Sequence, residues 1–167
     1  MRTLRILSIG LATLFLAGRV GGLETKGGTS FDRLKSLAGE WEGKSADGKT
    51  VTLKSRLVSG GSAIEETLEP VGEPSMVTIY HLDGGRLMVT HFCSAGNQPR
   101  MVTENTGGDG KRLAFSYLDA TNLSSADAGH MQKLVVSFQD ADHFAQEWTW
   151  REKGQEKTEV MSFARKK

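Results

Sequence analysis

The chain of 167 residues is poor in several residue types, with one cysteine, three prolines and two tyrosines. A single cysteine cannot form an internal disulfide, so Cys93 is a buried thiol, a ligand or a reactive group. The 21 basic and 20 acidic residues give a formal net charge of +1, which provides no attraction for nucleic acid. The chain also lacks internal repeats, and its length fits one domain with one hydrophobic core.

The only long apolar run lies at the N-terminus. A short basic segment, residues 1–5, precedes the apolar residues 6–17, and small residues follow up to Gly22. This run is shorter than the about 20 residues of a membrane-spanning helix, and the pattern is typical of a secretory signal peptide. We therefore expect a signal peptide at residues 1–22, an exported protein (periplasmic or secreted), and no stable membrane span in the mature chain. An uncleaved N-terminal anchor is the alternative.

Residues 23–30 are rich in glycine, threonine and lysine and are expected to be a flexible leader. Phe31, Leu34 and Leu37 then follow at intervals of three, which predicts one short helical turn with a buried edge. We place the folded domain at residues 31–167. Without residues 1–22 the chain keeps 18 basic and 20 acidic residues, a formal charge of −2.

From Trp41 onward the apolar residues alternate with a period of two, as in half-buried strands. Turn residues such as Asp47-Gly48, Gly60-Gly61 and Lys153-Gly154 separate the runs. The pattern predicts an all-β fold, a single antiparallel up-and-down β-barrel of about ten strands, because closure removes exposed strand edges. A β-sandwich is the alternative. The predicted strands are 39–44, 50–59, 62–69, 75–82, 86–93, 100–105, 112–119, 130–139, 143–152 and 156–165.

The segment 76–93 is predicted to be a β-hairpin with its turn at Asp83-Gly84-Gly85. A two-residue Gly84-Gly85 turn pairs the opposite charges of Asp83 and Arg86, and we prefer this register. It places one set of side chains on a common face: Thr78, Tyr80, Val89, His91 and Cys93. A three-residue turn would instead bring His81 to the face of His91.

Several motifs carry a resemblance to a known family. Gly39-Glu40-Trp41 at the start of the first strand and Arg165 at the end of the last resemble the signature of the calycins, the lipocalin-like barrels. In that family the tryptophan closes the barrel floor and the arginine packs over it, which implies a cation–π contact between Trp41 and Arg165. Longer segments resemble a bacterial calycin-like group of unknown function; they are residues 31–43, 80–84, 90–93, 96–100, 119–122 and 146–150.

The resemblance implies that a small hydrophobic or amphipathic molecule binds in the barrel mouth. The candidate ligand-binding residues are Tyr80, His91, Cys93, Asn97, Gln98, Arg100, Asn122, His130, Glu147 and Trp148. An inward Arg100 would select an anionic head group, with an inward Glu147 balancing it. The alternative is a strand-end charge on Arg100 paired with Glu104.

Nitrobindin has a distantly similar shape and binds haem through a histidine near its C-terminal strands. His130 and His143 lie in that region of this chain, but no nitrobindin motif matches residue by residue. We therefore predict no cofactor.

His91 and Cys93 would lie on one strand face with their bases about 7 Å apart. Both are ligands for zinc or copper, but no spacing supplies the other ligands, so we predict no metal. Parallel side chains also make a poor catalytic dyad, and no oxyanion hole is visible. We favour a binding protein over an enzyme. The alternatives are an enzyme or metal-binding protein using His91 and Cys93, and a structural envelope protein with a filled barrel.

Overall fold

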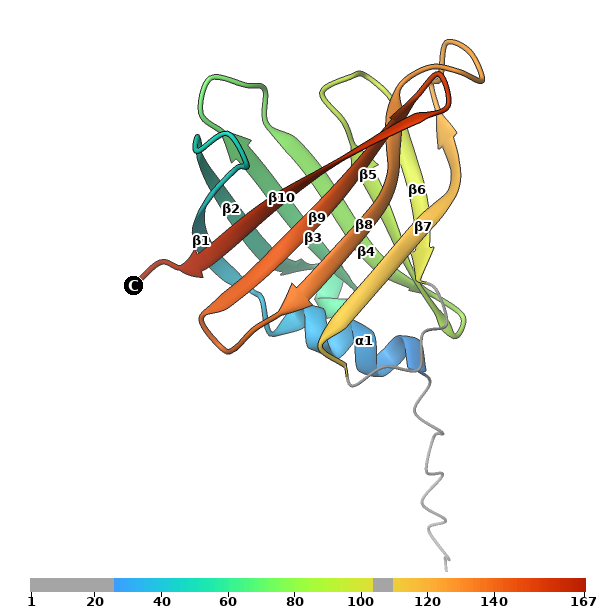
Figure 1. Ribbon diagram of the computed structural model, residues 1–167. Helices are drawn as coiled ribbons and strands as arrows, with labels where there is room; N and C mark the ends of the chain where they lie inside the picture. The colour runs from blue at the N-terminus through green and yellow to red at the C-terminus, as the bar shows by residue number, and fades with distance from the viewer. Residues whose placement is uncertain (1–25, 104–109) are drawn as a thin grey trace, which may run out of the picture.

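The computed structural model describes residues 26–103 and 110–167. The predicted signal peptide, residues 1–22, and Glu104 lie outside the described residues. Ten antiparallel strands follow one another around a closed barrel in chain order, and β10 pairs with β1 to complete it (Figure 1). This confirms the predicted up-and-down barrel.

The elements lie close to their predicted ranges. The helix is α1 (Lys26–Lys35), a single 3₁₀ turn spans Ser59–Gly61, and the strands are β1 (Gly39–Lys44), β2 (Thr50–Val58), β3 (Ala63–Pro70), β4 (Met76–Asp83), β5 (Arg86–Phe92), β6 (Gln98–Thr103), β7 (Arg112–Thr121), β8 (His130–Phe138), β9 (His143–Glu152) and β10 (Gln155–Arg165). The helix begins at Lys26, so residues 26–30 are helical rather than part of an irregular leader.

The hairpin of β4 and β5 has the preferred register. Asp83 pairs with Arg86 and Leu82 with Leu87, and Arg86 Nη2 lies 2.6 Å from Asp83 Oδ2. Tyr80 and His91 are consequently on the face that is turned into the barrel, where each is about 1% exposed.

Helix α1 lies across one end of the barrel, which we call the helix-covered end (Figure 1). Phe31, Leu34 and Leu37 are buried, as their three-residue spacing predicted. Trp41 Nε1 donates a hydrogen bond to the carbonyl of Leu37 at 2.8 Å. The Arg165 guanidinium lies 4.1 Å from the centroid of the Trp41 ring, which is the contact implied by the calycin resemblance.

Aromatic rings fill the interior above this floor. Phe144 meets Trp41 edge to face at 4.7 Å between centroids and stacks on Phe163 at 5.0 Å. Gly43 leaves room for them, since a Cβ there would lie 2.7 Å from the Phe163 ring. Large rings therefore pack against one another in the interior at this end of the barrel.

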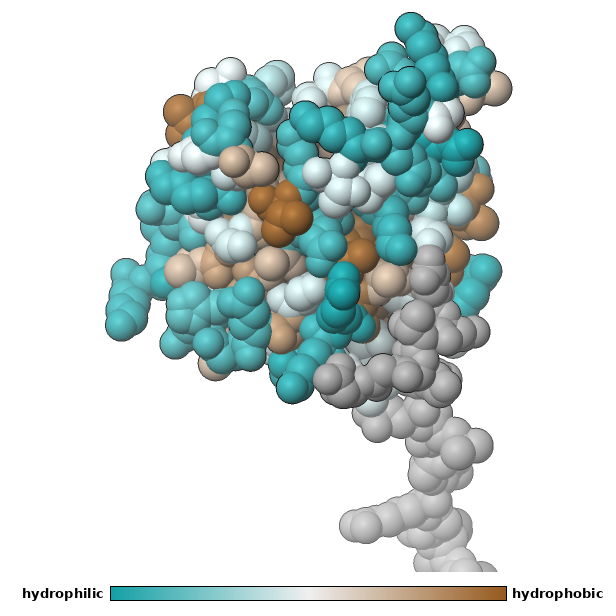
Figure 2. Space-filling model, in the orientation of Figure 1, coloured by the Kyte–Doolittle hydropathy of each residue, from teal (hydrophilic) through white to brown (hydrophobic). Residues whose placement is uncertain are grey.

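The outer surface is mainly hydrophilic on the face that Figure 2 shows, with isolated apolar side chains. The large exposed apolar residues come from separate elements: Leu57, Val71, Leu82, Phe92, Leu118 and Val160. No helix in residues 26–103 and 110–167 has the length and apolar character that crossing a membrane would require.

Candidate functional site

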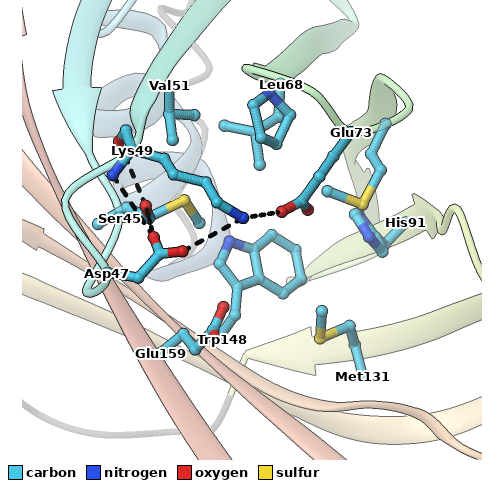
Figure 3. A pocket seen from close by; sticks show the side chains of 13 residues that line it. Ser45, Asp47, Lys49, Val51, Leu68, Glu73, His91, Met131, Trp148 and Glu159 are labelled. Carbon is cyan, nitrogen blue, oxygen red and sulfur yellow. Dashed lines mark hydrogen bonds and ion pairs between the residues drawn. The ribbon is translucent and has the colours of Figure 1, made fainter.

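A pocket of about 100 Å³ occupies the end of the barrel opposite α1, which we call the open end (Figure 3). Two turns overhang it, residues 45–49 between β1 and β2 and residues 71–75 between β3 and β4. The residues that line it are Ser45, Asp47, Lys49, Val51, Leu68, Pro70, Glu73, Met76, His91, Met131, Trp148, Glu159 and Met161.

The inner part of the pocket is mainly apolar. Its walls come from alternating inward positions of the strands, where side chains such as Val51 and Leu68 are buried. The Trp148 ring lies in the middle of the view in Figure 3. Its Nε1 donates a hydrogen bond to Gln146 Oε1 at 3.0 Å, which fixes the orientation of the ring.

His91 supplies the inner polar group of the pocket. Its Nδ1 is hydrogen-bonded to Thr78 Oγ1 at 2.9 Å, and its ring centroid lies 4.6 Å from that of Trp148. Burial lowers the pKa of His91 to about 4, so the imidazole is neutral at physiological pH. Its Nε2 has no hydrogen-bond partner among the described residues. A buried polar atom of this kind is rare and indicates a place for a ligand or a water molecule.

Lys49 bridges the mouth of the pocket. Its Nζ lies 3.0 Å from Glu73 Oε1 and 3.2 Å from Asp47 Oδ2, and so it joins the two overhanging turns (Figure 3). The hydrogen bond to Glu73 raises the pKa of Lys49, and the hydrogen bond from Ser45 lowers the pKa of Asp47. All three side chains are about half exposed, so the bridge is a weak one that can open.

A buried carboxyl group adjoins the pocket. Glu66 is 3% exposed and accepts a hydrogen bond from Gln146 Nε2 at 2.8 Å. Burial raises the pKa of Glu66 to about 7, and burial also raises the pKa of Tyr80 beside it. Tyr80 Oη makes no hydrogen bond of normal geometry. Gln146 therefore connects a carboxyl group that titrates near neutral pH to the Trp148 ring in the pocket.

Of the residues proposed from the sequence, the structure brings His91 and Trp148 together in this pocket. Tyr80 is buried in the interior but outside the pocket lining. Cys93 follows the end of β5, where its backbone N–H donates to the carbonyl of Asn97 at 3.1 Å. The thiol is half-buried and is not part of the lining, so it does not share a pocket with His91.

Arg100 and Glu147 do not point inward. Arg100 lies between the buried Pro99 and Met101, so alternation along β6 turns it outward, where its guanidinium forms a two-pronged ion pair with Asp119. Glu147 is likewise on the outer face and binds Arg112 at 2.9 Å. The prediction that Arg100 and Glu147 point into the barrel is therefore wrong.

The other candidates hold loops together at the open end. Asn97 Nδ2 donates to the carbonyl of Gly129 at 2.8 Å, and Asn122 Nδ2 donates to that of Gly96 at 2.5 Å. Gln98 accepts a hydrogen bond from Thr121 Oγ1 at 2.7 Å. The His130 ring lies 4.6 Å from the Tyr117 ring at a tilt of 40°, and both of its ring nitrogens are hydrogen-bonded, to the Ala128 carbonyl and Gln132.

The Lys49–Glu73 bridge at the mouth of the pocket and the buried carboxyl group of Glu66 were not predicted from the sequence. Lys49 and Glu73 belong to turns that are 24 residues apart and become neighbours only because β1 to β4 run in order around the barrel. Glu66 did have a local signal. It lies between Ile64 and Leu68 on the inward face of β3, at a position where an acid is unexpected.

The fold and the site define a closed ten-stranded up-and-down barrel with a pocket at its open end. No protein-family model and no curated protein matches the chain. Among solved structures it is similar to Rv2717c from M. tuberculosis, with a TM-score of 0.58 and 15% identity over 83% of this chain and 98% of that one. It is also similar to a protein of unknown function of the DUF3598 family from Nostoc punctiforme, with a TM-score of 0.54, 16% identity, and 78% and 48% of the two chains covered. At these identities the likeness concerns the fold alone.

Proposed function

We propose that this chain is an exported, calycin-like binding protein that holds a small, mostly apolar molecule in the pocket at the open end. The observation that carries the proposal is the buried Nε2 of His91, which has no partner among the described residues and borders an apolar chamber. An apolar pocket with a few polar groups is the usual form of a small-molecule site. The sequence of residues 1–22 supports export.

The size of the pocket limits the ligand. At about 100 Å³ it is smaller than the about 300–1,000 Å³ of sites for drug-sized molecules. A cavity of roughly 150 Å³ accommodates benzene. A single ring or a short branched chain therefore matches the space better than a complete fatty acid.

The charges at the mouth indicate a neutral ligand. Asp47, Glu73 and Glu159 line the mouth with one cation of the lining, Lys49, and Lys49 is already paired with two of the three carboxylates. An anionic head group would meet a net negative rim. The expectation of an anionic head depended on Arg100, which is bound to Asp119 outside the barrel.

Two probes of similar size test this proposal. Benzyl alcohol has a ring for the apolar wall and a hydroxyl group that can hydrogen-bond His91, whereas benzoate has the same ring and a carboxylate. We expect benzyl alcohol to shift the ¹³C-methyl NMR signals of the three pocket methionines, Met76, Met131 and Met161, while those of Met88 and Met101 stay in place. Benzoate is expected to bind more weakly. Equal shifts of all five signals, or none, would contradict a specific pocket.

Export is tested separately by fractionating cells that express the full chain and measuring the mass of the product. We expect a product in the exported fraction that lacks about 22 residues. A full-length product confined to the cytoplasm would contradict export and leave the pocket proposal standing.

The competing functions receive less support from the geometry. Haem coordination of the nitrobindin type needs a free imidazole nitrogen in an enclosed space near the C-terminal strands. His130 is bonded at both nitrogens, and His143 pairs with Asp140 through Nδ1 and is about half exposed. An enzyme based on His91 and Cys93 needs both groups in one site, and Cys93 is outside the pocket lining.

A further inference from the structure

We propose that the same pocket is also a site for a soft monovalent metal ion, Cu(I) or Ag(I), with His91 Nε2 and the thioether sulfurs of Met76, Met131 and Met161 as its ligands. This inference goes beyond the binding of an organic ligand. The sequence suggested Cys93 as the second metal ligand beside His91, whereas the structure places methionines there. The four side chains come from β4, β5, β8 and β10 and meet only in the closed barrel.

The imidazole has the arrangement of a metal ligand. In metal sites the second ring nitrogen of a histidine donates its proton to a fixed acceptor, and this orients the ligating nitrogen. Thr78 Oγ1 stands 2.9 Å from Nδ1 of His91 and can accept that proton. The lone pair of Nε2, which has no partner among the described residues, is then free to bind a metal.

The methionines make the ligand set a soft one. Three of the six methionines in the chain line a single pocket of about 100 Å³. Thioethers are polarizable and their unbranched side chains adjust easily, and ligands of this softness select Cu(I) among the biological metals. In Figure 3 the side chains of His91 and Met131 lie to the same side of the Trp148 ring, whose face adds a favourable environment for a cation.

Hard cations are poorly served by the same space. Calcium and magnesium require several oxygen ligands, and the carboxylates of the mouth, Asp47 and Glu73, are bound to Lys49. Among the described residues no group of three histidine, cysteine, aspartate or glutamate side chains is placed to hold a metal, which also disfavours a structural zinc site. The thioethers are therefore the ligands that distinguish this pocket.

The test uses Ag(I), which needs no reductant, and the full chain with Cys93→Ser, because a free thiol binds silver by itself. Calorimetric titration in chloride-free buffer measures stoichiometry and affinity. ¹³C-methyl methionine NMR then identifies the ligands. We expect one silver ion per chain and shifts of the Met76, Met131 and Met161 methyl signals, with Met88 and Met101 unaffected. Cu(I) is expected to give the same pattern in competition with a bicinchoninate chelator.

Matched variants separate sulfur ligation from simple burial. Met131→Leu keeps the apolar volume and removes one sulfur, so silver affinity should fall by about 100-fold. Met88→Leu removes a buried methionine that does not line the pocket, and silver affinity should stay the same. Thr78→Val should weaken binding by about 10-fold, as the loss of a supporting hydrogen bond to a ligating histidine does. Thermal unfolding checks that each variant folds, and Met76→Leu and Met161→Leu replace any that does not.

The inference is overturned if the Cys93→Ser chain binds no silver. It is also overturned if the leucine variants of Met131, Met76 and Met161 bind silver with the same affinity as the Met88→Leu control. Benzyl alcohol binding, measured on the same Cys93→Ser chain, reports on the organic ligand independently. A chain that binds the alcohol and not silver refutes only the metal site, and the opposite result refutes only the organic ligand.

Discussion

The two ends of this barrel are built from the same ten strands but differ in what fills them. At the helix-covered end, Trp41, Phe144 and Phe163 are each at most 2% exposed and pack ring against ring. At the open end a pocket remains between apolar walls, and a charged bridge through Lys49 crosses its mouth. One end is packed as a solid core, and the other retains space and unpaired polar atoms.

The difference indicates that stability and binding are located at opposite ends. Close packing of large rings contributes dispersion and burial energy, whereas a buried polar atom such as His91 Nε2 costs free energy unless something binds it. A protein keeps such atoms where they serve a ligand. Changes at the helix-covered end should therefore alter folding, and changes at the open end should alter binding.

The largest expected effect is that of Phe144→Ala at the helix-covered end. Removal of a fully buried ring that contacts Trp41 and Phe163 should lower the free energy of unfolding by about 3–5 kcal/mol. Met131→Ala at the open end is the matched change, and its cost should stay below about 2 kcal/mol because Met131 is only partly buried beside existing space. Urea unfolding measures both. Equal losses of unfolding free energy in the two variants would contradict the proposal that stability and binding are located at opposite ends.

Glu66→Gln should change how stability depends on pH. The folded pKa of Glu66 is raised to about 7 from 4.5 by burial, so the folded state holds this proton more tightly than the unfolded chain does. The stabilisation from the protonated group is complete below pH 4.5 and is lost as the pH rises from 4.5 through 7. The free energy of unfolding of the variant, measured relative to that of the wild type, should therefore rise by about 3 kcal/mol between pH 4 and pH 8. A constant difference across that range, measured by urea unfolding, would show that Glu66 does not titrate there.

Lys49→Met should alter ligand exchange and leave folding nearly unchanged. Exposed ion pairs contribute little to stability, but without Lys49 the carboxylates of Asp47 and Glu73 repel each other across the mouth. We expect benzyl alcohol to leave the variant several-fold faster, as measured by NMR line shape. In the wild type, added salt should speed release because it screens the bridge. A wild-type rate that does not respond to salt would mean that the bridge does not gate the pocket.

Arg100→Gln should have the smallest effect. Arg100 is about half exposed and bound to Asp119 on the outer face. The variant should therefore bind benzyl alcohol and benzoate with the same affinities as the wild type. A marked loss of benzoate binding in the variant would restore the anion site expected from the sequence and place Arg100 near the ligand.

Much of the fold could be predicted because its signals are local. Alternation with a period of two marked all ten strands, and β1 and β9 have the same bounds that the pattern indicated. The charges of Asp83 and Arg86 identified the hairpin register. The helix start was missed because Lys26 to Ser30 lack the apolar spacing of a buried face, although the chain continues the helix through them.

The candidate site was predictable only in part. Alternation placed His91 and Trp148 on inward faces, and both line the pocket. It did not reveal which inward residues share a level of the barrel, because that depends on the stagger between strands. Arg100 was misplaced because its neighbours in sequence did not settle which face of β6 is inward until β6 was seen against β5 and β7.

The sequence by itself determined the strands, their turns and the central hairpin register, since each depends on residue type and short-range spacing. The contact of Trp41 with Arg165 joins the first and last strands, and only the calycin resemblance implied it. Only the tertiary structure decided that Met76, His91, Met131 and Met161 surround one space and that Lys49 reaches Glu73 across it. Those contacts join strands distant in the chain. Their meeting requires the barrel to close with one particular stagger, which no local pattern encodes.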